Sequence, residues 1–277
     1  MSRLHFVFMT LAGLWCSFAI HAQDLYSAKS TEAFANYLFT KGDYGYAAEE
    51  YSRLLFMHPS DDSVLIRLSQ SYRKLNQYER ACQVITEHRT PNGRSQGVEK
   101  ELLSALIFQK DSMAFVSALG RFRHLDSSTL LRSQVEFSIL TRHWEVARDF
   151  VKSSQVSNFP WSPVYQENIE AVLAFRPKKP WLASVYSAII PGTGKIYSNN
   201  VKEGITSFLF VGALAYQSYR GFHKRGTKSF TGWLYGGLSF GFYLGNIYGA
   251  QQSAKNYNAR NLNRIYHEVD QTIYSRH

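Results

Sequence analysis

Cysteine is almost absent from this chain, which has two cysteines among its 277 residues. Cys16 lies in an N-terminal segment that we expect to be removed, so the exported protein keeps only Cys82. A single cysteine excludes an intrachain disulfide. An exported protein without disulfides is typical of the bacterial envelope, and this is where we place the chain.

Complete catalytic and metal-binding motifs are also missing. The segment Gly192-Thr-Gly-Lys195 is only part of a phosphate-binding loop, because Ile189 and Ile196 stand where that loop needs a glycine and a hydroxyl residue. The nine histidines lack the spacing of metal ligands, and no Gly-x-Ser-x-Gly motif is present. We therefore predict that the chain is not an enzyme and binds no cofactor and no metal.

Acidic residues are scarce in the last hundred positions. Residues 23–177 contain 18 Lys or Arg and 18 Asp or Glu, whereas residues 178–277 contain 12 Lys or Arg and 3 acids. The basic residues of the second region flank long uncharged runs, and this pattern favours a membrane surface over nucleic acid. We expect membrane lipid as one partner and no nucleic acid.

The N-terminus has the features of a secretory signal. Arg3 supplies the positive start, and residues 6–20 form an apolar run that is too short to span a membrane comfortably. We predict a signal peptide over residues 1–22, with an uncleaved anchor as the alternative. A lipoprotein is disfavoured, because Trp15 precedes Cys16 where a small residue would be needed.

The first half of the chain repeats itself with a period of 34 residues. This shift superposes four pairs: Leu38 and Tyr72, Tyr44 and Tyr78, Ala47 and Ala81, and Tyr51 and Ile85. The pattern resembles the tetratricopeptide repeat. The resemblance implies an all-α fold in which antiparallel helix pairs stack into a short α-solenoid. It also implies close packing at Ala47 and Ala81, where a small side chain meets a large one.

The repeat pattern weakens after the second unit but continues. Trp144 and Ala147 restore the motif about two repeat lengths further along. Residues 102–122, which lie between the second unit and Trp144, have helical periodicity. A helix over residues 162–175 is predicted to cap the stack. We therefore expect roughly four helix pairs in a domain that covers residues 23–177.

Stacked repeats of this kind present a concave groove, and the resemblance implies that a protein or peptide partner binds there. The groove candidates are Glu32, Asn36, Thr40, Ile66, Gln70 and Lys74. The alternative is that these side chains are only the solvated face of a structural stack.

Three uncharged runs define a second predicted domain, residues 178–255. They cover residues 180–194, 204–219 and 229–254. The third run is long enough to span a bilayer, the second is marginal and the first is too short. We predict a re-entrant or interfacial helix over 181–190, spans over about 203–220 and 229–250, and a polar tail over 256–277.

Glycine is regularly spaced in the third run. Gly237, Gly241, Gly245 and Gly249 recur every four residues, so a helix places them on one face. In lipid such a face lets another helix approach closely, with Gly212 and Ala215 as a candidate counterface or a second copy as a homo-oligomer partner. The abundance of aromatic residues and glycine leaves β-strands over residues 230–248 as an alternative.

The connector between the second and third runs is basic. It contains Arg220, Lys224, Arg225 and Lys228 and no acid. The positive-inside rule places this loop, residues 220–228, in the cytoplasm. We therefore predict a protein of the bacterial inner membrane with its repeat domain in the periplasm.

A short turn motif precedes the first predicted span. It has the form Pro-Gly-x-Gly-x-x-Tyr and consists of Pro191, Gly192, Gly194 and Tyr197. This segment resembles bacterial two-helix membrane hairpins of the TM2-like type, over roughly residues 182–250. The resemblance implies an architecture without a known activity, and the chain departs from it at Lys195, where Gln is common.

Two functions are compatible with these features. The first is a membrane-anchored extracytoplasmic scaffold whose repeats recruit a protein partner. The alternative makes the hairpin the working part, in membrane assembly, insertion or transport, with the repeats as a sensor.

Overall fold

The computed structural model describes residues 27–88, 93–153 and 155–277, and these residues form helices joined by turns and irregular connectors, without a strand. The all-helical class is confirmed for these residues, and the alternative of β-strands over 230–248 is wrong. The predicted signal peptide lies outside the described residues. The chain forms two compact units that divide between His143 and Trp144.

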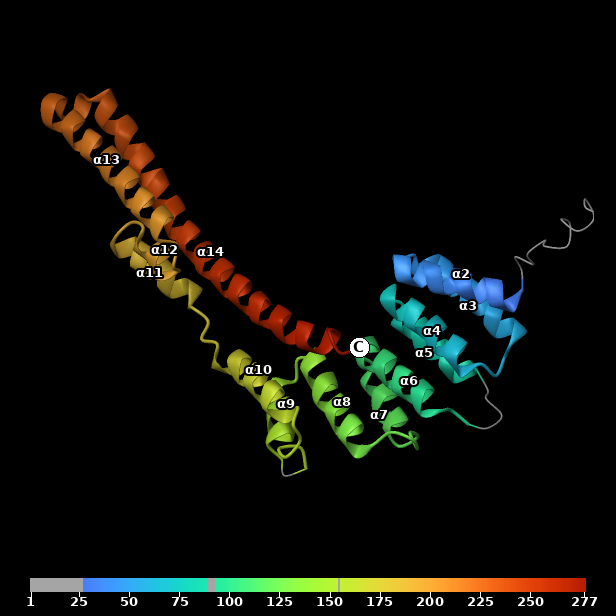
Figure 1. Ribbon diagram of the computed structural model, residues 1–277. Helices are drawn as coiled ribbons and strands as arrows, with labels where there is room; N and C mark the ends of the chain where they lie inside the picture. The colour runs from blue at the N-terminus through green and yellow to red at the C-terminus, as the bar shows by residue number, and fades with distance from the viewer. Residues whose placement is uncertain (1–26, 89–92, 154) are drawn as a thin grey trace, which may run out of the picture. The chain divides into compact units, whose positions relative to one another are not determined.

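The N-terminal unit is a series of helices that pack in chain order (Figure 1). They are α2 (Ala28–Lys41), α3 (Tyr44–Met57), α4 (Asp62–Lys74), α5 (Tyr78–Glu87), α6 (Gln96–Gln109), α7 (Ser112–Leu119) and α8 (Ser127–Leu140). Short turns fold α2 back on α3 and α4 back on α5. This arrangement has the helix-pair architecture that the 34-residue period predicts.

The 34-residue period recurs in the residues that begin the first helix of each pair. Ser27, Asp61 and Ser95 are spaced by 34, and each side chain accepts a hydrogen bond from a backbone N–H of the helix it precedes. Such caps satisfy donors that the helix itself cannot pair. The period therefore sets where each pair starts.

The turns inside the pairs carry the same period in their backbone angles. Gly42, Asn76 and Lys110 are spaced by 34 and have positive φ values of 89°, 59° and 58°, and Arg142 follows with 65°. Left-handed backbone is uncommon for residues other than glycine. Its recurrence at one place in successive pairs shows that the third pair keeps the register where its sequence motif is weak.

The helix crossings explain why that motif weakens. Ala47 and Ala81 are fully buried, as predicted for the small residues that let two helices approach. The equivalent position of α7, another 34 residues on, is Phe115, which is 2% exposed. Its ring stacks on Phe137 of α8 with centroids 4.1 Å apart. In the third pair, an aromatic contact between α7 and the following helix takes the place of the small alanine that lies at the crossing in the first two pairs.

The C-terminal unit begins with α9 (Trp144–Lys152) and α10 (Ser162–Ala174). It continues with α11 (Pro180–Ile189), α12 (Thr193–Tyr197), α13 (Val201–Arg225), the 3-10 turn η2 (Gly226–Lys228) and α14 (Phe230–Tyr274). The sequence assigned α9 and α10 to the repeat domain, but in the structure they belong to the compact unit of the later helices.

The C-terminal end of α14 is the reason for this difference. Residues 256–277 were predicted to be a polar tail, yet they continue the helix, and Ile273 is fully buried. Tyr266 stacks on Trp144 of α9 with centroids 5.4 Å apart. Arg276 donates to the hydroxyl of Tyr165 on α10 at 3.3 Å. The tail thus packs against α9 and α10 instead of extending into solvent.

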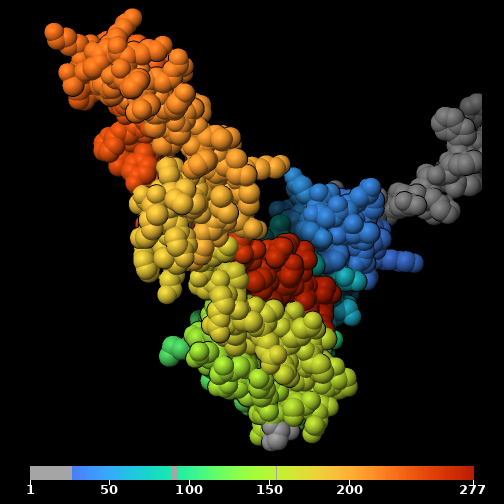
Figure 2. All heavy atoms as spheres, turned by 90° about the vertical axis from the view of Figure 1, so that its left-hand side faces the viewer, coloured from blue at the N-terminus to red at the C-terminus, as the bar shows by residue number. Residues whose placement is uncertain are grey.

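Helices α13 and α14 form a long hairpin, and α11 and α12 pack against it (Figure 1). Figure 2 shows the tip of the hairpin, drawn in orange, standing clear of the yellow α11 and α12. Among the described helices, none combines the length and the apolar character that crossing a membrane requires. The two predicted spans therefore coincide with helices but gain no support from their hydropathy.

We expect Lys110→Gly to stabilise the third helix pair by about 1 kcal/mol, because glycine adopts the left-handed backbone without steric cost. The measurement is the opening free energy of α6 and α7 from hydrogen exchange with mass spectrometry. Lys100→Gly is the matched control in the interior of α6, and it should destabilise the same region by about 1 kcal/mol. Equal effects of the two substitutions would contradict the turn assignment.

Candidate functional site

A polar pocket of about 450 Å³ lies between the first two helix pairs. Its lining comes from α2, α3 and α4 and consists of Glu32, Asn36, Tyr51, Ser63, Val64, Ile66, Arg67 and Gln70. The two α2 residues are four apart, and on α4 Ser63, Ile66 and Gln70 recur at intervals of three and four, so each helix contributes one face. We call this the repeat pocket.

The floor of the repeat pocket is held by a buried tyrosine. Tyr51 is 1% exposed, and its hydroxyl donates to Oδ1 of Asn36 at 2.7 Å. Burial raises the pKa of Tyr51, and the nearby Arg67 and Glu32 act on it in opposite directions. The phenol is therefore a permanent donor at neutral pH, and it fixes the orientation of the Asn36 carboxamide.

The rim of the pocket carries opposite charges. Arg67 lies over the ring of Phe39, 5.0 Å from its centroid, and it donates to Oε1 of Gln70 at 3.4 Å. Glu32 supplies the acid from α2. Two carboxamides between an acid and a guanidinium can donate to and accept from a peptide group, and they can orient its charged neighbours.

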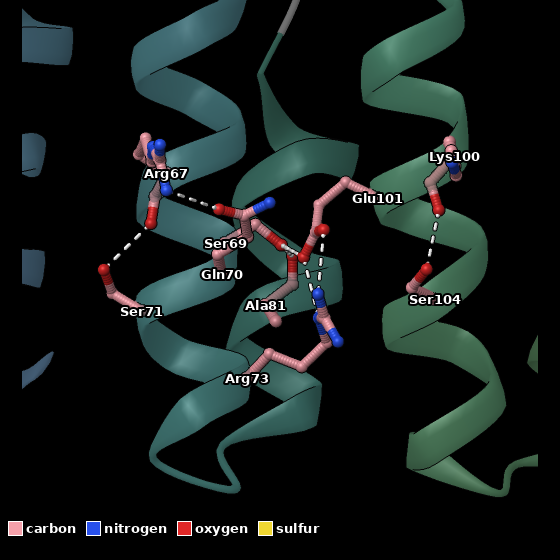
Figure 3. Close-up of polar contacts among 9 residues, drawn as sticks. All are labelled: Arg67, Ser69, Gln70, Ser71, Arg73, Ala81, Lys100, Glu101 and Ser104. Atoms are coloured by element: carbon pink, nitrogen blue, oxygen red, sulfur yellow. Dashed lines mark hydrogen bonds and ion pairs between the residues drawn. The ribbon is translucent and has the colours of Figure 1, made fainter. Parts of the chain in front are cut away.

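A buried ion pair ties α4 to α6 beside this pocket (Figure 3). The carboxylate of Glu101 accepts from Nε and Nη2 of Arg73 at 2.9 and 3.1 Å, and both side chains are at most 7% exposed. The hydroxyl of Ser69 lies 3.2 Å from both Glu101 and the carbonyl oxygen of Ala81. Because a shifted register would leave a buried charge unpaired, the pair favours one alignment of the two helices.

A second buried carboxylate of α6 holds the connector that follows α7. Glu99 accepts from the backbone N–H groups of Arg123 and His124 at 3.0 and 2.8 Å. Burial opposes ionisation of Glu99, but these donors and the His124 ring outweigh it and lower the pKa of the carboxyl group. Both buried acids of α6 thus serve packing.

The structure brings together four of the six predicted groove residues. Glu32, Asn36, Ile66 and Gln70 line the repeat pocket. Thr40 and Lys74 do not line it, and the hydroxyl of Thr40 donates to its own helix at the carbonyl of Asn36.

Sequence reasoning missed two important pocket residues, Tyr51 and Arg67. Tyr51 was recognised only as a repeat position, and its hydroxyl could not be assigned a partner without the neighbouring helix. The only sequence feature that pointed to Arg67 was its position directly after Ile66, a predicted groove residue on α4.

Cys82, the cysteine of the described part of the chain, is buried on α5. Cys82 is 7% exposed, and burial, followed by the charge of Glu101, raises the pKa of its thiol to about 12. It is therefore a packed neutral side chain. Among the described residues, no three of His, Cys, Asp and Glu come together in a way that could hold a metal ion.

The Pro-Gly-x-Gly turn of the C-terminal unit is built on backbone contacts. Gly192 has φ 92°, and a Cβ there would lie 2.0 Å from the carbonyl oxygen of Gly204 on α13. A Cβ on Gly194 would lie 1.8 Å from the carbonyl oxygen of Ala183 on α11. The motif therefore joins α11, α12 and α13 at distances that only glycine permits.

Tyr197, the last residue of the motif, closes the same junction. Its hydroxyl accepts from the backbone N–H of Lys179 at 3.1 Å, and its ring meets that of Tyr186 edge to face. It also packs against the buried alanines of α11 and α14, which are Ala183, Ala250 and Ala254. Gly192, Gly194 and Tyr197 of the motif thus act in packing.

The regularly spaced glycines of α14 do not make the helix contact that was predicted for them. A Cβ on Gly237, Gly241 or Gly245 would meet nothing within 4 Å, and the same holds for the proposed counterface residue Gly212. Only Gly249 has a close neighbour, the side chain of Lys195. The prediction that this face packs on the second run is wrong within the chain.

Other small residues form the contact between the two hairpin helices. A Cβ on Gly221 of α13 would lie 2.6 Å from the backbone nitrogen of Gly232 on α14. Ser218 donates to the carbonyl oxygen of Gly232 at 2.8 Å, and Ser239 donates to that of Val211 at 3.2 Å. Hydroxyl-to-backbone bonds of this kind replace the expected glycine face.

Neither a family model, nor a curated protein, nor a solved structure matches this chain. The repeat pocket and the glycine junction are therefore interpreted from their own geometry.

We expect Gly194→Ala to destabilise the junction of α11, α12 and α13 by about 2 kcal/mol or more, because its methyl group would overlap a backbone carbonyl. Hydrogen exchange of these three helices measures the effect. Gly212→Ala is the matched control, since open space surrounds that position. It should stabilise α13 by up to about 1 kcal/mol through helix propensity, and similar losses in both variants would contradict the close approach.

Proposed function

We propose that this protein is a membrane-attached scaffold of the bacterial envelope. Its N-terminal unit binds an extended segment of a protein partner, and its C-terminal unit attaches to lipid. The observation that carries the proposal is the contrast between the units, since one offers a polar pocket and the other exposes an apolar hairpin surface.

The chemistry of the repeat pocket supports a peptide ligand. Asn36 and Gln70 each offer a carbonyl oxygen and an amino group, which match the donor and acceptor of a peptide bond. Glu32 and Arg67 add opposite charges at the rim, which favour one direction of a bound segment. The pocket lining is too polar to favour a hydrophobic anchor residue, so recognition is mainly through hydrogen bonds.

The surface of the hairpin supports attachment to lipid. Its exposed apolar side chains include Phe208, Leu209, Tyr216, Tyr219, Phe230, Trp233, Phe240 and Tyr248, each at least half exposed. Many exposed large apolar side chains on one hairpin are unusual for a protein that meets only water. The basic residues at the hairpin tip, which lie at the end of α13 and in η2 rather than in the predicted loop, complement anionic headgroups. The signal peptide predicted from the sequence supports a location outside the cytoplasm.

The open glycine face favours a second candidate function. Gly237, Gly241 and Gly245 leave space that another copy of the helix could fill, so the hairpin could assemble in the membrane with the repeats as a sensor. This candidate does not use the repeat pocket, and the two are therefore separable by substitution.

The scaffold proposal predicts that Arg67→Ala combined with Gln70→Ala reduces partner recovery about tenfold or more, because both pocket side chains are lost. The measurement is affinity capture of the full chain from solubilised membranes, with quantitative mass spectrometry. Arg80→Ala combined with Gln83→Ala is the matched control on the exposed side of α5. Partners recovered equally with both double variants would count against binding in the repeat pocket.

The lipid-attachment proposal predicts that Lys224→Gln combined with Lys228→Gln weakens binding to anionic vesicles about thirtyfold, because each lysine near the surface contributes about 1 kcal/mol. Vesicle flotation of the full chain at two salt concentrations measures this. Lys29→Gln combined with Lys41→Gln removes the same charge from α2 and should leave flotation unchanged. A full chain that stays unbound from every vesicle would refute the attachment.

A further inference from the structure

The buried seam of α14 changes character along its length. Gly232, Ser239, Asn246 and Ser253 are spaced by seven, which is close to two helical turns, and all four are buried. Near the tip, Gly232 and Ser239 are hydrogen-bonded to α13. Asn246 and Ser253 have no side-chain hydrogen-bond partner in the described part of the chain. The unpaired half of the seam lies where two pockets open.

Asn246 is the strongest sign that something is missing from this site. The residue is 5% exposed, and neither the oxygen nor the nitrogen of its carboxamide has a hydrogen-bond partner among the described atoms. An unpaired buried amide is costly, and folded proteins rarely leave one without a ligand or an ordered water. Its neighbours on α14, Tyr243 and Ile247, are bonded to α11, so the helix cannot rotate to release it.

Asn246 lines a groove of about 560 Å³ along the hairpin. The walls are apolar and come from Phe210 and Val211 of α13 and from Leu238 and Phe242 of α14. The glycines at 237, 241 and 245 form the rest of the lining on α14 and leave it open. This volume falls in the range of small-ligand sites, which is roughly 300–1,000 Å³.

A second, polar pocket of about 760 Å³ continues from the groove and shares Lys195 with it. It is lined by the carboxamides of Asn199, Asn200, Gln252 and Asn256, by Ser253, and by the charged residues Glu203 and Arg260 among others. Lys195 and Arg260 outnumber the single carboxylate, so the pocket favours an anion.

Lys195 stands at the boundary between the two pockets. Its side chain is 17% exposed, and Nζ donates to the hydroxyl of Ser207 at 3.0 Å. The nearest carboxylate oxygen, on Glu203, is 3.9 Å away on a side chain that is 63% exposed. Such a loose and hydrated ion pair neutralises little of the charge. The lysine is therefore free to pair with an anionic group that enters from either pocket.

We propose that this continuous site binds one anionic single-chain lipid, with the acyl chain in the apolar groove and a phosphate-bearing headgroup in the polar pocket. Lys195 pairs with the phosphate at the junction, and the Asn246 carboxamide bonds to the ester region beside it. The proposal goes beyond the scaffold function and does not depend on a partner in the repeat pocket.

A lipid fits the site better than a helix of a second copy. The carbonyl oxygens of a second helix could accept from the Asn246 amino group, as those of Gly232 and Val211 accept from serines here. The N–H groups in the interior of a helix are already paired, however, so they could not donate to the Asn246 oxygen. A glycine face alone would accept a helix, but a glycine face that ends at a half-buried lysine and an unpaired amide calls for an apolar chain with a polar, anionic end.

Native mass spectrometry of the full chain, released from non-ionic detergent, tests the proposal. The probes are palmitoyl lysophosphatidylglycerol, which is anionic, and palmitoyl lysophosphatidylcholine, which has the same chain and a zwitterionic headgroup. We expect one molecule of the anionic probe to be retained, with an affinity about tenfold higher than that of the zwitterionic probe. Absence of a retained molecule, or equal retention of both probes, overturns the proposal.

Three variants locate the site. Gly241→Leu fills the open groove and should abolish retention while the helix stays folded, and Gly212→Leu is its control on a face outside the groove. Lys195→Gln should lower the affinity for the anionic probe about tenfold. Its control is Lys202→Gln, an exposed lysine that lines neither pocket.

Asn246→Leu separates a ligand-binding role from a merely structural one. Leucine has a similar size and no unpaired polar atoms, so the free chain should become more stable while retention of the probe falls. Higher stability with unchanged retention would overturn the role of Asn246 and with it the proposed site.

The oligomeric state completes the test. If light scattering shows that the wild-type chain is dimeric and that Gly241→Leu is monomeric, the groove is an interface between copies and the lipid proposal fails. Vesicle flotation is measured in parallel with the same variants. Normal flotation of Gly241→Leu without probe retention would refute neither proposal, because it is the result expected if the surface attachment and the lipid site are separate.

Discussion

Close approach of helix backbones is the constraint on which both units depend. The backbones of two helices can come into near contact only where the side chain between them is very small, because a larger one would overlap the facing backbone. Ala47 and Ala81 meet this condition in the N-terminal unit, and Gly192 and Gly194 meet it in the C-terminal unit. The helices elsewhere take their positions from these crossings.

The N-terminal unit shows how a repeat survives the loss of its motif. The caps and the left-handed turns keep the period of 34 residues through Ser95 and Lys110, although Phe115 replaces the small crossing residue. The positions of the caps and left-handed turns thus repeat more regularly than the residue types at the helix crossings. The buried pair of Arg73 and Glu101 adds a contact between neighbouring helix pairs, beside the pocket that we propose for a peptide.

The C-terminal unit combines tight contacts with unfilled space. Glycine junctions hold α12 against α11 and α13, and hydroxyl groups hold the distal part of the hairpin. Between these contacts the face of α14 around Gly241 stays open, and Asn246 is buried without a partner. The rigid contacts on both sides prevent the hairpin from collapsing into this space, which is what a preformed ligand site requires.

The sequence by itself determined the helical class, the 34-residue period and the turn at Gly192 and Gly194, because these depend on interactions within a few residues. It also placed four of the repeat-pocket residues, since residues on one helical face follow from spacing alone. The sequence did not show which helix each of these faces would pack against. From the four-residue spacing we expected the face of α14 that contains Gly241 to pack on α13. In the structure, α14 packs on α13 along the seven-residue series that includes Ser239, because two long helices stay in contact only along a period near two turns. The tail around Tyr266 and the environment of Asn246 depend on contacts with distant segments, and only the tertiary structure decided them.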